Sequence, residues 1–201
     1  MRAPGRAVAL LLLLAVNAAS VCAAHAGEWK VGLKRLTLRD PVGGGAMTGF
    51  ATYPTAARPK SLTVGRFSMM AAEGAAPATE QFPLVIVSHG TGALPDVYRW
   101  LFEGLTARGF VVAGIAHPGD NYDDRSGSFG DALLVDRPRH ISALIDALEA
   151  GSVLAPAIDA GKIGIVGHSA GGYAGILSAG GAPDFSQLSS GRCRRTGQDP
   201  R

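Results

Sequence analysis

Cysteine is scarce in this sequence, with two residues among 201. Cys22 lies in an N-terminal apolar segment, and Cys193 lies near the opposite end. This scarcity excludes a disulfide framework as the source of stability. If Cys22 is removed, Cys193 is either a free surface thiol or half of a bond whose partner is missing, and the sequence leaves both alternatives open.

Long apolar runs are also missing beyond the N-terminus, where no stretch reaches the roughly 18 to 20 residues that a membrane helix needs. The run Ala7–Val16 is shorter, follows Arg2 and Arg6, and precedes the small-x-small pattern Ala24-His25-Ala26. This order is typical of an export signal. We therefore predict a signal peptide over residues 1–26, an exported periplasmic or extracellular protein, and no stable membrane span.

Clustered charge of one sign is missing as well. The net charge of +3 falls to +1 when Arg2 and Arg6 are removed, and the one basic cluster is Arg192, Arg194 and Arg195. This pattern gives no sign of a nucleic-acid-binding face. Residues 27–201 are enough for one hydrophobic core and too few for two ordinary domains, so we predict a single domain.

The N-terminal part of the mature chain predicts two outer strands. Residues 29–38 alternate apolar and polar side chains, and residues 49–53 form a second candidate strand. The stretch 54–81 is rich in Ala, Pro and Gly with little periodicity, so we predict a surface loop there. A tail over about 186–201, rich in Ser, Arg and Gly, is predicted to be disordered.

The rest of the chain alternates strand-like and helix-like segments. The predicted strands are 84–87, 110–116 and 162–166, and the predicted helices are 96–108, 136–150 and 170–179. The continuous β-branched runs are typical of strands buried on both faces. The order predicts an α/β fold, with a mostly parallel sheet covered by helices on both faces.

The strongest chemical signal is Gly167-His168-Ser169-Ala170-Gly171, which matches G-x-S-x-G between a predicted strand and a predicted helix. A tight turn there would project the Ser169 hydroxyl out of the sheet. The helix that follows points backbone N–H groups at developing negative charge. Ser169 is therefore the candidate nucleophile, with Gly167, His168 and Gly171 as supporting residues of the turn.

A second signal, Ser88-His89-Gly90-Thr91-Gly92, follows an earlier predicted strand at the same sheet edge. Its glycines allow backbone amides to approach a substrate oxygen, and two such donors would stabilise an oxyanion. We assign the donors to the amides of Thr91 and Ala170. His89, Gly90 and Gly92 are predicted to support this loop.

Together the two motifs resemble the α/β-hydrolase family. More narrowly, the segments 85–92, 109–120, 136–148 and 164–172 resemble exported proteins grouped with dienelactone hydrolases and platelet-activating-factor acetylhydrolases. The resemblance implies a serine hydrolase of carboxylic esters with a Ser-His-Asp triad and an acyl-enzyme on Ser169. It also implies no metal or organic cofactor, and a small-molecule or lipid ester substrate with an acetyl or short acyl chain.

The sequence departs from this family after the nucleophile. In the family the acid and the histidine follow the serine, whereas no histidine follows Ser169 here. We also count about five strands against the family's eight. We therefore interpret the sequence as the N-terminal portion of an esterase, truncated after the helix that follows Ser169.

Upstream histidines are weak substitutes for the missing base. His117 is the least implausible, because it ends a predicted strand at the site edge, whereas His140 is predicted at a helix start. Asp120, Asp123 and Asp124 are expected to solvate a loop or line the pocket mouth. Two alternatives stay open: a depolymerase, thioesterase or peptidase on the same scaffold, and a non-catalytic exported protein that lacks the triad Asp and His.

Overall fold

A computed structural model describes residues 28–128, 130 and 133–182. The predicted signal peptide, Cys193 and the predicted tail lie outside these residues. Within them, no helix is long and apolar enough to cross a membrane.

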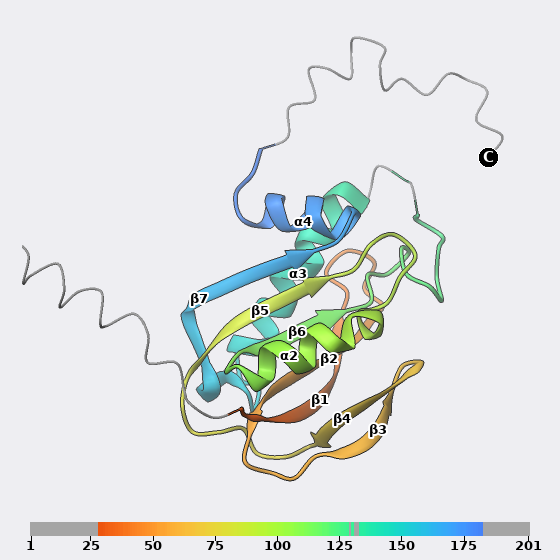
Figure 1. Cartoon of the computed structure of the whole chain (residues 1–201). Helices are drawn as coiled ribbons and strands as arrows, with labels where there is room; N and C mark the ends of the chain where they lie inside the picture. The colour runs from red at the N-terminus through yellow and green to blue at the C-terminus, as the bar shows by residue number, and fades with distance from the viewer. Residues whose placement is uncertain (1–27, 129, 131–132, 183–201) are drawn as a thin grey trace, which may run out of the picture.

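The described residues form one seven-stranded sheet in the order β3-β4-β1-β2-β6-β5-β7 (Figure 1). The strands are β1 (Lys30–Arg39), β2 (Ala46–Thr55), β3 (Lys60–Val64), β4 (Phe67–Glu73), β5 (Phe82–Ser88), β6 (Val111–Ile115) and β7 (Ile158–Gly167). The helices are α2 (Arg99–Ala107), α3 (Leu133–Glu149) and α4 (Ala170–Ser178), with 3₁₀ turns η1 (Pro95–Tyr98) and η2 (Ala155–Ala157).

The α/β class is confirmed, and each of the three strands expected in the parallel part is present. β5 pairs in parallel with both β6 and β7. The N-terminal strands make the whole sheet mixed, because β2 pairs antiparallel with β1 and β6, and β3 pairs antiparallel with β4. Two of these antiparallel pairs join strands that are consecutive in the chain, for which a short turn suffices.

The prediction of a loop over residues 54–81 was wrong, and so was the count of about five strands. β3 and β4 form a hairpin within this stretch, with Gly65 at its turn in a left-handed conformation (φ 58°). One side of the hairpin is apolar, since Val64, Met69 and Ala71 are buried. The alternation was hard to recognise because alanine fills buried positions in β4 that larger apolar residues usually mark.

Two apolar clusters lie on the two faces of the sheet. Along β5, Leu84 and Ile86 belong to the cluster that contains Leu144 of α3, whereas Val85 and Val87 belong to the one that contains Phe102 of α2. This split follows from the two-residue period of a strand. The predicted arrangement of helices on both faces is therefore confirmed, with α2 on one face and α3 and α4 on the other.

The strand that precedes Ser169 lies at one end of the sheet. β7 pairs only with β5 among the described strands, so its other edge is open (Figure 1). Most of its residues are exposed or half-buried, including Ile163 and Val166, which corrects the expectation of a strand buried on both faces. An apolar parallel edge is therefore available for pairing with another chain.

We predict that the 201-residue chain self-associates through this edge, and that Ile163→Lys weakens the association several-fold. A lysine at this position opposes edge-to-edge pairing because its charge must stay hydrated. Val153→Lys is the matched control, since Val153 is 62% exposed and lies outside the strands and helices. Sedimentation velocity over a concentration series measures the effect. A monomer with a sharp, cooperative thermal transition at all concentrations would contradict the prediction.

Candidate active site

Ser169 occupies a strained turn between β7 and α4. Its backbone angles are φ 52° and ψ −121°, and it is the one residue other than glycine with positive φ in the described part of the chain. Such a conformation costs roughly 1 to 3 kcal/mol and persists only where the surroundings impose it. Ser169 is exposed in the described structure.

The two glycines of the motif are required by close backbone packing. A Cβ on Gly167 would lie 2.2 Å from the carbonyl oxygen of Gly171, and a Cβ on Gly171 would lie 2.0 Å from the carbonyl oxygen of Ser88. The first contact closes the turn around Ser169. The second brings the start of α4 against the end of β5, and so places the turn beside the loop that follows β5.

The Ser169 turn and the loop 88–92 are in direct contact. The backbone N–H of His168 donates to the carbonyl of Ser88 (3.2 Å), and a Cβ on Gly90 would lie 2.8 Å from Nδ1 of His168. Among the described residues, no hydrogen bond is recorded for the backbone N–H of Thr91 or of Ala170. The structure thus brings the predicted nucleophile and the loop of the predicted oxyanion donors to one edge of the sheet.

His117 and His140 are buried in a hydrogen-bonded chain that runs from Ser88 to Asp40. His117 Nε2 lies 2.9 Å from Ser88 Oγ, His117 Nδ1 lies 3.3 Å from His140 Nδ1, and His140 Nε2 lies 3.1 Å from Asp40 Oδ1. The carboxylate only accepts, so the neutral rings donate in the order Ser88, His117, His140, Asp40. His117 is 1% exposed and structural in this arrangement, which leaves no ring nitrogen free for Ser169.

Two sequence-based expectations for this region were wrong. His140 lies two turns inside α3 rather than at a helix start, because the helix begins at Leu133. Asp120 is buried and forms an ion pair with Arg137 (2.7 Å), in which both side chains are at most 2% exposed. Asp123 and Asp124 do lie in an exposed loop, as expected.

Arg137 and Asp40 were not recognised from the sequence. The available signal for Arg137 is its spacing: it shares one face of α3 with His140, Ile141, Leu144 and Leu148, all of which are buried. A charged residue on the apolar face of an amphipathic helix indicates a buried partner. Asp40 lies in the turn between β1 and β2, and its contact with His140 spans 100 residues, so no local pattern reveals it.

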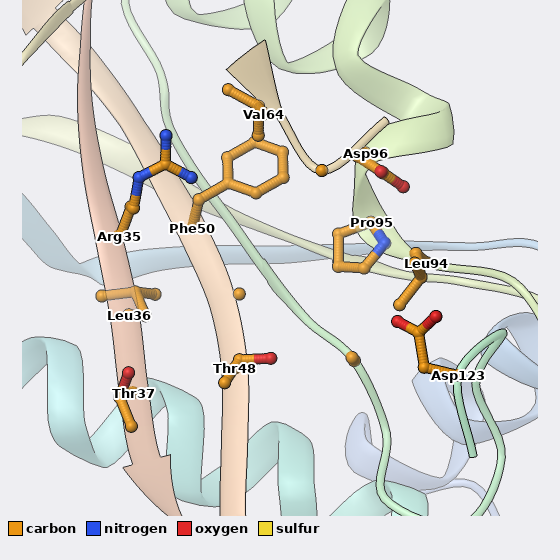
Figure 2. Close-up of a pocket in the computed structure, with 13 residues that line it drawn as sticks. Arg35, Leu36, Thr37, Thr48, Phe50, Val64, Leu94, Pro95, Asp96 and Asp123 are labelled. Atoms are coloured by element: carbon orange, nitrogen blue, oxygen red, sulfur yellow. The ribbon is translucent and has the colours of Figure 1, made fainter. Parts of the chain in front are cut away.

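A pocket of about 330 Å³ adjoins the loop on the α2 side of the sheet. In Figure 2, Arg35 and Phe50 lie across from Leu94 and Pro95, which continue the chain after the loop. Ser169 is not part of its lining. The described residues also contain no group of three or more His, Cys, Asp or Glu side chains placed to hold a metal ion.

Comparisons with known proteins agree with this geometry. Residues 53–132 match the family described as "Platelet-activating factor acetylhydrolase, isoform II". A solved ferulic acid esterase from Streptomyces cinnamoneus is 24% identical, with a TM-score of 0.65 over 78% of this chain. The strained serine turn at the end of a parallel strand is the feature that decides among α/β folds. The chain has the α/β-hydrolase fold.

A second similar solved structure is that of DcsB in complex with its substrate analogue. It is 13% identical, with a TM-score of 0.50 over 74% of this chain. The present chain covers 57% of the ferulic acid esterase and 41% of DcsB, so it spans about half the length of these structures. A search of curated proteins found no match.

We predict that Gly171→Ala destabilises this α/β-hydrolase fold by about 3 kcal/mol, because the new methyl group would overlap backbone atoms that cannot move independently. Gly172→Ala is the matched control. Its methyl group would lie 3.4 Å from the Gly167 carbonyl oxygen, an ordinary contact distance, and alanine favours a helix by up to about 1 kcal/mol over glycine. Urea unfolding of both variants measures the difference. Equal stabilities would contradict the close packing of α4 on β5.

We also predict that the free energy of unfolding falls as the pH drops below about 6.5, by roughly 2 to 3 kcal/mol per pH unit. Burial lowers the pKa of His89 to about 4 and lowers that of His117 well below its ordinary value, and Arg137 nearby adds to both shifts. The unfolded chain therefore binds more protons than the folded one in this range, so acid favours unfolding.

Urea unfolding at pH 7.5, 6.0 and 5.0 measures this slope. His117→Asn removes one of these titrating groups and should reduce the slope by about 1.4 kcal/mol per pH unit. A free energy of unfolding that stays constant from pH 7.5 to 5.0 would show that these rings are not held neutral by the fold.

Proposed function

We propose that the protein is a serine hydrolase of carboxylic esters in which Ser169 is the nucleophile. The observation that carries the proposal is the positive φ of Ser169, held by glycine contacts beside a loop in which the Thr91 N–H donates to no other described residue. In this mechanism Ser169 Oγ attacks the ester carbonyl and the alcohol leaves. Water then hydrolyses the acyl-enzyme.

The amides of Thr91 and Ala170 are proposed to stabilise the oxyanion. Ala170 is the first residue of α4, where a helix leaves its N–H groups without intrahelical partners and carries a positive partial charge. Thr91 belongs to the loop that contacts the turn through Gly90 and His168. Donors preorganised in this way contribute roughly 2.7 to 4 kcal/mol each to catalysis.

The general base is proposed to come from outside the described residues. His117 and His140 are engaged in the buried chain that ends at Asp40, and His89 is buried as well. His168 is the residue before Ser169 in the turn, and its ring packs against Gly90. If no general base is supplied, the protein is the alternative named above, a non-catalytic protein with an α/β-hydrolase-like fold.

The substrate class is proposed from the family match. Residues 53–132 match a family that is described by its action on platelet-activating factor, an acetylated lipid, which supports acetylated or short-chain lipid-like esters. The ferulic acid esterase is named for a different ester, and its likeness supports only the fold. Export to the periplasm or the cell exterior remains a proposal that rests on the N-terminal sequence.

A fluorophosphonate probe tests the nucleophile. We expect Ser169-dependent labelling of a longer polypeptide that supplies a general base, and labelling of the 201-residue chain that is slower by about 10² or more, because a general base contributes about 10² to 10⁴. Ser169→Ala should abolish labelling. Ser88→Ala is the control, since Ser88 also contacts a histidine but is only 2% exposed.

The outcomes separate the parts of the proposal. Labelling of neither polypeptide, or labelling that survives Ser169→Ala, contradicts the assignment of the nucleophile. Equally fast labelling of both polypeptides contradicts the placement of the base, and shows that a residue of this chain activates Ser169.

A further inference from the structure

We propose that His89, Asp120 and Arg137 are positioning residues that orient the Gly90–Thr91 peptide, so that the Thr91 N–H is presented to the substrate oxygen. The inference rests on the proposed function and assigns a task to a buried ion pair that the reaction itself does not use. None of the three side chains needs to touch substrate. Each holds a backbone group of the loop from beneath.

His89 is held in one tautomer. The backbone N–H of His117 donates to His89 Nε2 (3.1 Å), so this nitrogen carries no proton. Because burial keeps the ring neutral at ordinary pH, with a pKa of about 4, the proton lies on Nδ1. His89 Nδ1 then donates to the carbonyl of Gly90, 2.8 Å away.

The carbonyl of Gly90 decides where the next amide points. In a trans peptide the N–H lies opposite the C=O, and the described chain contains no cis peptide bond. The N–H of Ala93 also donates to the Gly90 oxygen (3.1 Å), so two donors hold this carbonyl on one side. The Thr91 N–H must therefore point to the other side of the loop.

Arg137 and Asp120 hold the flanking groups. Arg137 Nη1 donates to the carbonyl of His89, and Asp120 Oδ1 accepts from the N–H of Gly92 at 3.3 Å. The two side chains are joined by hydrogen bonds from Nε (3.0 Å) and Nη2 (2.7 Å) of Arg137 to Asp120 Oδ2. Ser128 Oγ donates to Asp120 Oδ1 (2.7 Å), which completes the support of the carboxylate.

Burial makes this support rigid. Arg137 and Asp120 are each 1% exposed, and His89 is fully buried. A hydrogen bond in such an environment does not exchange with water, and removing one partner leaves the other unsatisfied. The loop backbone is therefore held at His89, Gly90 and Gly92, on both sides of the Thr91 amide.

Two substitutions of His89 test the orientation. In His89→Asn the amide nitrogen takes about the place of Nδ1 and can still donate to Gly90, whereas in His89→Gln the side-chain amide takes about the place of Nε2 and cannot. We expect His89→Asn to keep the rate of fluorophosphonate labelling within a few-fold. We expect His89→Gln and Arg137→Lys to lower it by about 10-fold or more, since loss of one oxyanion donor costs about 10² to 10³.

His140→Gln is the control for general damage to the buried cluster. His140 is as buried as His89 but contacts His117 and Asp40 rather than the loop. It should lower stability without changing the labelling rate of the folded protein. Equal labelling rates for wild type, His89→Asn, His89→Gln and Arg137→Lys would overturn the inference, and so would equal losses in the Asn and Gln variants.

Hydrogen exchange of the loop provides a readout that does not depend on catalysis. Mass spectrometry of the peptide covering residues 88–94 should show faster exchange in His89→Gln than in His89→Asn, with no difference for residues 46–55. This result supports the inference even if Ser169 never reacts. Failure of the proposed function can therefore be distinguished from failure of the inference about the loop. Identical exchange of residues 88–94 in the two variants overturns it.

Discussion

Gly171 lies so close to Ser88 that a methyl group on it would come within 2.0 Å of the Ser88 carbonyl oxygen. This contact joins the start of α4 to the end of β5. Because β5 and β7 run in parallel, their ends already share one edge of the sheet. The contact removes the remaining separation, so the strained Ser169 turn and the loop 88–92 form one site.

Beneath that site the protein buries an unusual amount of polar chemistry. Three histidines, two aspartates, Arg137 and Ser88 are each at most 5% exposed. Such groups are costly to bury unless every donor and acceptor is satisfied, and here hydrogen bonds link them into connected chains. Their arrangement explains why one loop of mostly small residues can hold a fixed backbone conformation at the edge of the sheet.

In contrast to this buried polar network, the edge of β7 that faces away from β5 is apolar and has no neighbouring strand among the described residues. Ile163 and Val166 are 38% and 43% exposed on the strand that leads into Ser169. A groove of about 760 Å³ lined by Ile163, Ile165 and Ile176 opens beside it. Within the described residues, the site is therefore firmly supported from β5 and α3, and is uncovered on the side of β7.

Local patterns in the sequence were sufficient for the parallel half of the fold and for the two motifs. The β-branched runs of β5 and β6, the apolar face of α3 and the G-x-S-x-G turn each depend on residues within a short window, and each is where it was expected. The β3–β4 hairpin was missed because its buried positions include small alanines. Its second strand, β4, also draws stability from pairing with β1 rather than from its own periodicity.

What only the tertiary structure decided is the task of each buried polar residue. The sequence shows His117, His140, Asp40, Asp120 and Arg137 as separate polar positions. Their partners lie 17 to 100 residues away, as with Asp120 and Arg137 or Asp40 and His140. A hydrogen bond across such a separation depends on how the sheet and α3 pack, and packing is not encoded in any local window.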